Sequence, residues 1–571
     1  MEPQLADISK NIDVCQTDHL PVIAAFCREL SIDKIVNRLV PSEMNLDPGT
    51  AVIGMILDTL SGRSPLYQLQ DFFELQDTEL LFGEPIPFTA FNDDAVGRVL
   101  DRLHDAGTMK IFTEISLTAC QRFDLATDRG HFDTTSVNVW GDYKDSQAGG
   151  DAPHITYGHS KDKRPDLKQF MISLLCVEGN IPLAGKLHDG NAADTKLNNE
   201  ELERLSSLIK ATDHERKDFL YIADCKLVTE ANLELMGDDP FITRLPASYN
   251  AHAEAIDAAL KADKWETIGI LNQTATSGNR PAADYKVNEQ TIELNGKKYR
   301  AIVVHSSSHA KQRTERIERD IRAAEAKVIA ACKQGHKQIY KCQGDAKESL
   351  KKLRKAFQGK LWEVTGEIEE IKVYGPGRAP AEGPKKVKSI SYRLKLQHHQ
   401  NTQRISKSKE RAGCFVLLTN TTNDPESKEK RYSAKDCLTN DKGQYGVERN
   451  FSFLKEPLIV NDIFLKKPER INALGMVMIL SLLVWSLMER TMRKTQAEKD
   501  LKLKDLDRKP TKRPTSFIMI HKFRGILVMR RGRERCLASP LSYEQGQYLI
   551  ALGLKGTIFT SKPNPPNKTT S

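Results

Sequence analysis

The order of strand and helix patterns between residues 130 and 246 is the feature that most constrains the fold. Hydrophobic periodicity predicts three strands, a helix, a strand, a second helix and a last strand. The segments are, in order, 130–140, 167–177, 181–189, 199–211, 218–224, 227–237 and 240–246. Because a helix between two strands makes a crossover, whereas short turns make hairpins, this order predicts an α/β sheet that mixes antiparallel and parallel pairs.

The length of 571 residues predicts several domains, because a single hydrophobic core stops growing well before that size. The apolar run 414–420 and the helical pattern 444–455 resume the α/β pattern after a long polar interval. We therefore expect an interrupted core. The expected parts are a helical N-terminal domain at 1–120, the core in two parts at 121–245 and 413–490, a β-rich and helical insertion at 246–412, and a basic C-terminal region at 491–571.

The N-terminal domain has apolar residues at helical spacing in two places, 50–60 after Pro48 and 93–107 after a candidate cap at Asn92. Several short helices of this kind fit a DNA-reading module. A dimerisation or packing domain fits them equally well, and the sequence leaves both interpretations open.

The net charge of +9 is concentrated in the C-terminal region. From Arg490 to Arg535 there are 16 Lys or Arg against 5 Asp or Glu, which leaves the remainder of the chain close to neutral. A local excess of this size is typical of a surface that binds a polyanion such as DNA. A solvated connector would show the same composition.

Two further patterns bear on location. The ten cysteines form no CxxC pair and the first residues show no secretory signal, so we expect a cytoplasmic protein without a zinc ribbon or disulfide framework. The apolar stretch 471–488 is long enough to span a membrane. Its isolation and its internal Asn472, Ser481 and Ser486 favour a buried core helix and no membrane contact.

Three acidic residues depart from their local patterns. Asp133 interrupts an apolar, β-branched strand, Asp224 ends another strand, and Glu448 lies on a helix with an apolar stripe. An aspartate inside a strand is disfavoured unless a partner compensates its desolvation. One divalent cation would satisfy several carboxylates, so the three could form a metal site. The alternative is that each is separately hydrogen-bonded or solvent-facing.

A set of motifs in order then gives a family resemblance. They are HFDTTSV, YGHSKDKRPDLKQF, YIADCKLVTEANLELM, FITRLP and YGVERNFSFLK. Over about residues 90 to 490 the chain closely resembles the Asp-Asp-Glu transposases of bacterial insertion sequences, in the superfamily numbered four, which carries a β-rich insertion before the glutamate. The resemblance implies a ribonuclease-H-like catalytic core in which Asp133, Asp224 and Glu448 are catalytic and hold Mg²⁺, for which Mn²⁺ could substitute.

The same resemblance implies an enzyme that binds the terminal inverted repeats of its element, cleaves the ends and joins the 3′-hydroxyls to target DNA. Cleavage and joining would be two-metal-ion phosphoryl transfers. The expected partners are double-stranded DNA and further copies of the chain, as a homodimer or larger, in a prokaryotic cytoplasm at the nucleoid. A catalytically silent DNA-binding scaffold and a nuclease that cannot join strands remain the alternatives.

The motifs also predict DNA contacts. Lys455 stands at the place of the family's lysine after the glutamate, and the segment 158–170 supplies four basic residues for phosphate contact. The expected DNA-binding residues are Lys455, Arg449, Lys161, Lys163, Arg164 and Lys168. The helix pattern with Arg313, Arg316, Arg319 and Arg322 is interpreted as a solvated, salt-bridged helix, with phosphate contact as the alternative.

One part of the family signature is missing. Gln444 and Asp441 stand where the family has an arginine and a tyrosine, while Tyr445 and Arg449 are close by but out of register. The family's tyrosine is linked to a flipped base and a hairpin intermediate. A hairpin route is therefore not carried over to this chain.

Overall fold

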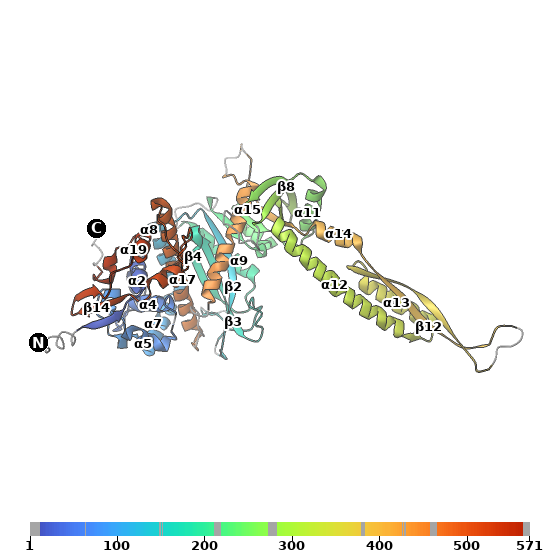
Figure 1. The fold of residues 1–571 in the computed structure, drawn as a ribbon, viewed down its shortest axis with the longest axis horizontal. Helices are drawn as coiled ribbons and strands as arrows, with labels where there is room; N and C mark the ends of the chain where they lie inside the picture. The colour runs from blue at the N-terminus through green and yellow to red at the C-terminus, as the bar shows by residue number, and fades with distance from the viewer. Residues whose placement is uncertain are drawn as a thin grey trace. The chain divides into compact units, whose positions relative to one another are not determined.

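The computed structural model consists of two compact units, unit 1 (Met1–Thr243 and Asn440–Ser571) and unit 2 (Arg244–Thr439). The structure describes residues 12–62, 64–144, 146–147, 150, 152–210, 218–271, 282–377, 383–424, 426, 430–456 and 465–563. The N-terminal residues inspected for a secretory signal lie mostly outside this part. Figure 1 labels many of the elements of both units.

Unit 1 begins with a strand and a set of short helices. These are β1 (Asp13–Gln16), α2 (Leu20–Glu29), α3 (Ile32–Leu39), α4 (Pro48–Thr59), α5 (Leu69–Glu74), α6 (Thr78–Phe82), α7 (Asp93–Asp105) and α8 (Thr108–Phe123). The side chain of Asn92 caps α7 by accepting a hydrogen bond from the Ala95 amide, so the predicted cap is confirmed. Pro48 opens α4, where its missing N–H costs nothing.

The predicted α/β pattern forms a mixed sheet. Its strands in unit 1 are β2 (Arg129–Val139), β3 (Lys168–Val177), β4 (Ile181–His188), β5 (Leu220–Ala223) and β6 (Phe241–Arg244), in the order β4-β3-β2-β5-β6. Pairs β2–β3 and β3–β4 are antiparallel, whereas β2–β5 and β5–β6 are parallel. The helices α9 (Asp194–Lys210) and α10 (Glu230–Met236) lie between the parallel strands in the chain. The prediction of a mixed sheet is confirmed.

The chain returns to unit 1 with α16 (Tyr445–Leu454) and α17 (Pro468–Lys499), after α15 (Ala434–Gly443). α17 packs against β4, α4, α7 and α8. By length and composition alone α17 could cross a membrane, but 89% of its most apolar window is buried inside the protein. The apolar stretch 471–488 is therefore a buried core helix, as the sequence predicted.

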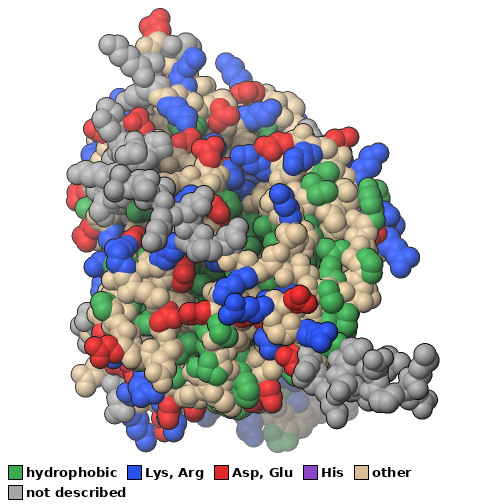
Figure 2. All heavy atoms as spheres, turned by 90° about the vertical axis from the view of Figure 1, so that its left-hand side faces the viewer, with side chains coloured by type: hydrophobic (Ala, Val, Ile, Leu, Met, Phe, Trp, Pro, Cys, Tyr) green, Lys and Arg blue, Asp and Glu red, His purple; other side chains and the backbone are tan. Residues whose placement is uncertain are grey.

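The C-terminal region folds back onto the start of the chain. It consists of α18 (Ser516–Phe523), β14 (Leu527–Arg531), β15 (Glu534–Leu537) and α19 (Tyr543–Ala551). β14 pairs antiparallel with both β1 and β15 in a three-stranded sheet. On the face of the molecule in Figure 2, Lys and Arg side chains are interspersed with Asp and Glu rather than gathered in one basic patch.

Unit 2 has a sheet-and-helix base and a projecting arm. The base contains α11 (Asn250–Ala262), β7 (Glu266–Ile270), β8 (Asp284–Leu294), β9 (Lys297–Ser306) and β13 (Cys414–Thr419), with strand order β13-β9-β8-β7. The arm, residues 307–411, contains α12 (Ser307–Lys337), β10 (Ile339–Tyr340), α13 (Gln343–Phe357), β11 (Trp362–Tyr374), β12 (Val387–Gln400) and α14 (Thr402–Glu410). The segment predicted as an insertion, 246–412, lies within unit 2, which also contains β13.

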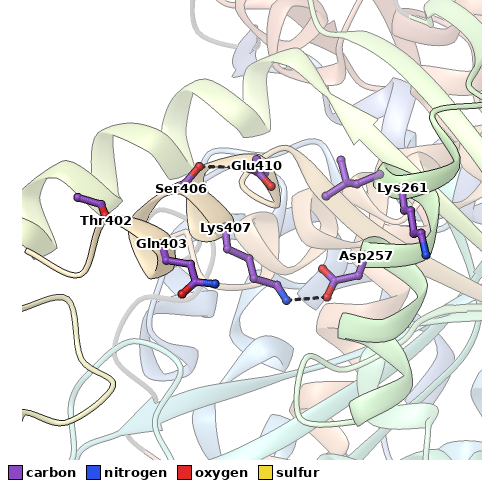
Figure 3. Close-up of a pocket in the computed structure, with 8 residues that line it drawn as sticks. Asp257, Lys261, Thr402, Gln403, Ser406, Lys407 and Glu410 are labelled. Carbon is purple, nitrogen blue, oxygen red and sulfur yellow. Dashed lines mark hydrogen bonds and ion pairs between the residues drawn. The ribbon is translucent and has the colours of Figure 1, made fainter.

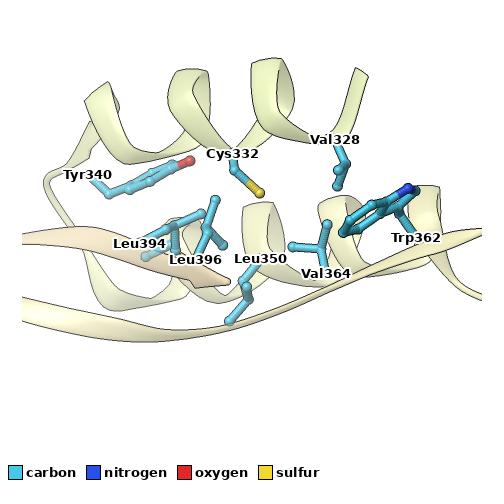
Figure 4. Close-up of a cluster of buried hydrophobic side chains, with 9 residues drawn as sticks. Val328, Cys332, Tyr340, Leu350, Trp362, Val364, Leu394 and Leu396 are labelled. Carbon is cyan, nitrogen blue, oxygen red and sulfur yellow. The ribbon is translucent and has the colours of Figure 1, made fainter. Parts of the chain in front are cut away.

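The arm has a small hydrophobic core of its own. α12 and α13 pack on one face of the β10-β12-β11 sheet, and Val328, Leu350, Trp362, Val364 and Leu394 are buried between them (Figure 4). Strand residues with even numbers point into this core, so those with odd numbers lie on the opposite face.

Part of the basic C-terminal tract is structural. The Arg535 side chain is only 2% exposed and donates to Asp77, which is also 2% exposed, and to Glu79. These contacts join β15 to the start of α6 and hold the pKa of Arg535 well above its usual range. Arg530 adds ion pairs to Asp77 and Asp13. Arg535 is thus unavailable to a polyanion in this fold.

Replacing Arg535 by alanine should lower the free energy of unfolding by about 3–5 kcal/mol, because the buried Asp77 would keep only its longer, 3.4 Å ion pair with Arg530. Urea denaturation measures the loss. Arg533→Ala removes an exposed arginine two residues away and should change the stability little. Equal effects of the two substitutions would show that the Arg535 ion pairs do not stabilise the fold.

Candidate active site

The strand register brings Asp133 and Asp224 next to each other. In the parallel pair β2–β5, Phe132 is opposite Ala223. Asp133 follows Phe132 within β2, and Asp224 follows Ala223, the last residue of β5. Parallel neighbouring strands hold equivalent positions about 4.8 Å apart, so the two carboxylates share one end of the sheet. Both side chains are half-buried.

Burial and like charge act on both aspartates. Burial raises the pKa of Asp133 to about 6, Lys161 lowers it, and the carboxylates of Asp224 and Asp194 raise it further. Burial also raises the pKa of Asp224, the amide of Lys226 opposes this, and Asp194 adds to it. The site therefore has a surplus of negative charge that a cation would relieve.

Asp194 is a third carboxylate that the sequence analysis missed. It is the first residue of α9, where it accepts a 2.6 Å hydrogen bond from the Thr134 hydroxyl and lies 3.6 Å from the Lys161 ammonium. The sequence signal was weak, because an aspartate at the start of a helix is usually explained by the helix dipole. Its contact with the residue after Asp133 places it at the candidate site.

Glu448 lies on α16, which packs against β2. Its side chain is exposed, and it is not among the five largest influences on the pKa of Asp133 or of Asp224. Among the described residues, no group of three or more His, Cys, Asp or Glu side chains could hold a metal ion as they stand. The structure thus couples Asp133 with Asp224 and Asp194, and the joint site with Glu448 stays a prediction.

Polar contacts fasten α16 to the β2–β4 segment. The Gln444 amide donates to the Phe132 carbonyl at 2.7 Å, and its oxygen lies 3.3 Å from Nδ1 of His131. The Asn450 amide donates to the Asn180 carbonyl at 2.7 Å. Gln444 thus links the helix of Glu448 to the strand of Asp133.

Two of the predicted DNA-binding lysines, Lys455 and Lys161, contact residues around this site. The Lys455 ammonium donates to both oxygens of Asp162 at 2.8 Å, which joins the end of α16 to the basic segment 158–170. In that segment, the Lys161 ammonium donates to the carbonyl and hydroxyl of Thr134. Lys161 therefore also counters the charge of the adjacent Asp133.

Two of the other basic residues contact neighbouring acidic, aromatic or backbone groups. Arg164 pairs with Asp166 at 2.8 Å and lies 5.5 Å from the ring centre of Trp140. Lys168 donates to the Asp142 carbonyl and lies over the Tyr157 ring.

Lys163 is exposed in a left-handed turn, with φ of 59°. Arg449 is exposed on α16 and lines a cavity of about 940 Å³ together with Trp485 and Arg493. All six predicted basic residues thus belong to unit 1, and the contacts above tie two of them, Lys161 and Lys455, directly to β2 and α16.

A second cavity, of about 780 Å³, lies in unit 2 between α11 and α14 (Figure 3). Asp257, the acidic residue that links the two helices, accepts hydrogen bonds from the Arg411 guanidinium. It also forms an ion pair with the Lys407 ammonium, 3.0 Å from its carboxylate oxygen. These contacts join the two helices. The carboxylate is fully engaged in this structural role, so we do not assign the chemistry to this cavity.

Comparisons with known proteins cover part of the chain. Residues 12–117 match the family described as "Domain of unknown function (DUF4277)". No curated protein matches the sequence. Among solved structures, the Mos1 transposase paired-end complex with the left transposon end is similar over 37% of this chain and 63% of that chain, at 13% identity and a TM-score of 0.15. The chain thus covers less than two thirds of that transposase, and a TM-score of this size establishes no shared fold.

The raised pKa of Asp133 predicts a pH-dependent gain in stability for Asp133→Asn. Below the ordinary pKa of 3.8 the carboxyl is protonated in both folded and unfolded protein, whereas above about pH 6 the folded state must hold a disfavoured charge. The variant should be more stable than the wild type by about 2–3 kcal/mol above pH 6, and equally stable below pH 4. Urea denaturation across pH tests this, with the exposed Asp142→Asn as control. A gain that is independent of pH would contradict the assignment.

Gln444→Ala should lower the free energy of unfolding by about 1–3 kcal/mol, because it removes the hydrogen bonds from α16 to β2. Tyr445→Ala, at a neighbouring side chain that is 65% exposed, is the matched control and should have little effect. Thermal or urea denaturation compares the two. If both variants are as stable as the wild type, the Gln444 contacts do not anchor the helix.

Proposed function

We propose that the chain is a DNA transposase of the Asp-Asp-Glu class, which binds the terminal inverted repeats of its element, cleaves at the ends and joins the 3′-hydroxyls to target DNA. One observation carries the proposal. The two aspartates that the motifs mark, Asp133 and Asp224, are adjacent on parallel strands, half-buried and electrostatically coupled. Perturbed carboxylates placed together at the end of a sheet are typical of catalytic sites.

The architecture supports the ribonuclease-H-like core that the resemblance implies. Three antiparallel strands, β4, β3 and β2, are extended by two parallel strands, β5 and β6. The glutamate comes from a helix packed on the strand of the first aspartate. In this arrangement unit 2 would be the insertion between the second aspartate and the glutamate.

The carboxylates suit Mg²⁺, with Mn²⁺ as a substitute, because hard divalent cations prefer oxygen ligands. Asp133, Asp224 and Glu448 would hold the metal, and Asp194 is close enough to Asp133 to assist. When bound, Mg²⁺ would supply charge stabilisation for an in-line attack on the scissile phosphate. The excess negative charge around Asp133 fits this role, since a cation would lower the raised pKa values.

The chain's own residues would position the DNA. Lys161 holds β2 from the segment 158–170 and would limit repulsion between the aspartates and an incoming phosphate. Lys455, now paired with Asp162, would exchange this carboxylate for a DNA phosphate near the cleavage site. Lys163, Arg164, Lys168 and Arg449 would contact the backbone further out.

Action on two element ends would require a homodimer or a larger assembly on DNA. The enzyme would work in the prokaryotic cytoplasm at the nucleoid, without contact to a membrane.

Substitution of Glu448 by Gln should abolish cleavage of a duplex that carries the element's terminal repeat, in the presence of Mg²⁺. Glu456→Gln, an exposed glutamate just past the end of the same helix, is the matched control and should retain cleavage. Equal activity of wild type and Glu448→Gln would overturn the proposed role of Glu448. A wild type that is inert under the same conditions would indicate a DNA-binding scaffold.

A pre-cut element end mixed with plasmid distinguishes a transposase from a nuclease, because only a transposase yields a joined product. Mg²⁺ should also raise the thermal stability of the wild type and much less that of Asp133→Asn, independently of activity. A stabilisation of equal size in both proteins would place the metal elsewhere.

A further inference from the structure

The arm of unit 2 carries the largest charge excess of the chain. Residues 307–411 contain 26 Lys or Arg and 12 Asp or Glu, an excess of fourteen, compared with +9 for the whole chain. The remainder of the chain is therefore net acidic. Outside the arm and the basic tract 490–535, the chain has sixteen more acidic than basic residues, and these offset the arm's excess in an average over the sequence.

The outer face of the arm's sheet is charge-balanced. Glu369 pairs with Arg393 across the strands at 2.7 Å, and Glu367 stands opposite Lys395 in the register. Arg393 also holds the pKa of Glu369 below its usual range. On the other face of the sheet, which carries the even-numbered residues, Lys372 lies 3.4 Å from Glu370 near the end of β11. The positive charges of Lys372, Arg393 and Lys395 therefore have acidic neighbours.

α12 is also partly balanced. Arg316 lies 4.0 Å from Asp320 one turn on, and Glu318 pairs with Lys409 of α14 at 3.4 Å. These pairs agree with the interpretation of this helix as solvated and salt-bridged, at least for the residues that take part.

α13 differs from both. Lys347, Lys351 and Lys355 follow one another at intervals of four residues, so they form a row along one side of the helix with a spacing of roughly 6 Å. We call this row the lysine stripe. Ala346 and Leu350 face the arm's core instead (Figure 4 shows Leu350).

The lysine stripe has no internal counter-charge. All three side chains are exposed, and within the part of the arm that the structure describes none of them has a hydrogen-bond or ion-pair partner. The nearest helical acid, Glu348, pairs with Lys352 at 2.7 Å. No large hydrophobic side chain is highly exposed among the described residues of α13, so the surface lacks the apolar centre of a typical protein interface.

We propose that the lysine stripe binds the phosphate backbone of double-stranded DNA. Duplex DNA carries one negative charge per about 1.7 Å of its axis, so three unpaired ammonium groups in a row can each neutralise a phosphate and release counterions. Lysine contacts phosphate as a point charge without reading the base sequence. The inference rests on the proposed function for its choice of polyanion, but it assigns a contact site in unit 2, separate from the candidate active site.

The test is the salt dependence of binding by the full-length protein to a DNA duplex of arbitrary sequence. The combined variant Lys347→Ala, Lys351→Ala, Lys355→Ala should bind more weakly, and its slope of log Kobs against log salt should be shallower by about 2.7, since each lost phosphate contact removes about 0.9. The matched control is Lys372→Ala, Arg393→Ala, Lys395→Ala. It removes the same charge from the balanced strands and should leave the slope nearly unchanged.

An unchanged slope in the lysine-stripe variant would overturn the inference, as would an equal change in the control, which would indicate a net-charge effect. Loss of binding to polyglutamate but not to DNA would indicate an acidic protein partner and also overturn it. If the combined variant fails to fold, Lys351→Glu alone should weaken DNA binding, and unaltered affinity would decide against the stripe.

The two proposals fail differently. Cleavage that still requires Glu448, together with an unchanged salt slope, would overturn the lysine stripe and leave the transposase proposal intact. A wild type that binds DNA through the stripe but does not cleave would overturn the catalytic proposal alone.

Discussion

The parallel pairing of β2 with β5 is the interaction on which the candidate site depends. It fixes Phe132 opposite Ala223 and so brings together two aspartates that are 91 residues apart in the sequence. A shift of one residue in either strand would turn one carboxylate to the other face of the sheet. The apolar residues around them, such as Tyr221 and Ile222, are fully buried and hold this register.

The sheet could be predicted because its signals are local. Strand alternation and helical spacing identified β2 to β6 with their helices, and the cap at Asn92 marked the start of α7. The position of Asp133 in an apolar strand was visible in the same way, since a carboxylate there needs a compensating group. The closeness of Asp133 and Asp224 followed from a family resemblance, and the electrostatic coupling between them agrees with it.

Other parts of the site depend on contacts that no local pattern encodes. Asp194 reaches the site only because α9 starts beside Thr134, and Gln444 matters because the chain returns from unit 2 to place it against Phe132. The local excess of basic residues in the sequence was a poor guide to which basic side chains are free to bind a polyanion. Arg535 belongs to the C-terminal tract whose composition favoured polyanion binding, yet its side chain is buried against Asp77. Lys351 is exposed, but it lies in the arm, whose positive charge is offset by acidic residues elsewhere in the chain.

The three-stranded sheet of β1, β14 and β15 has a consequence for synthesis on the ribosome. β1 ends at Gln16, and its hydrogen-bonding partner β14 begins at Leu527. At 5–20 residues per second, the edge of β1 would wait roughly 25 to 100 s for this partner to be translated. During that time the backbone N–H and C=O groups of β1 have no partner strand and could pair with another chain. The N-terminal helices must therefore fold before β14, the partner of β1, has been synthesised.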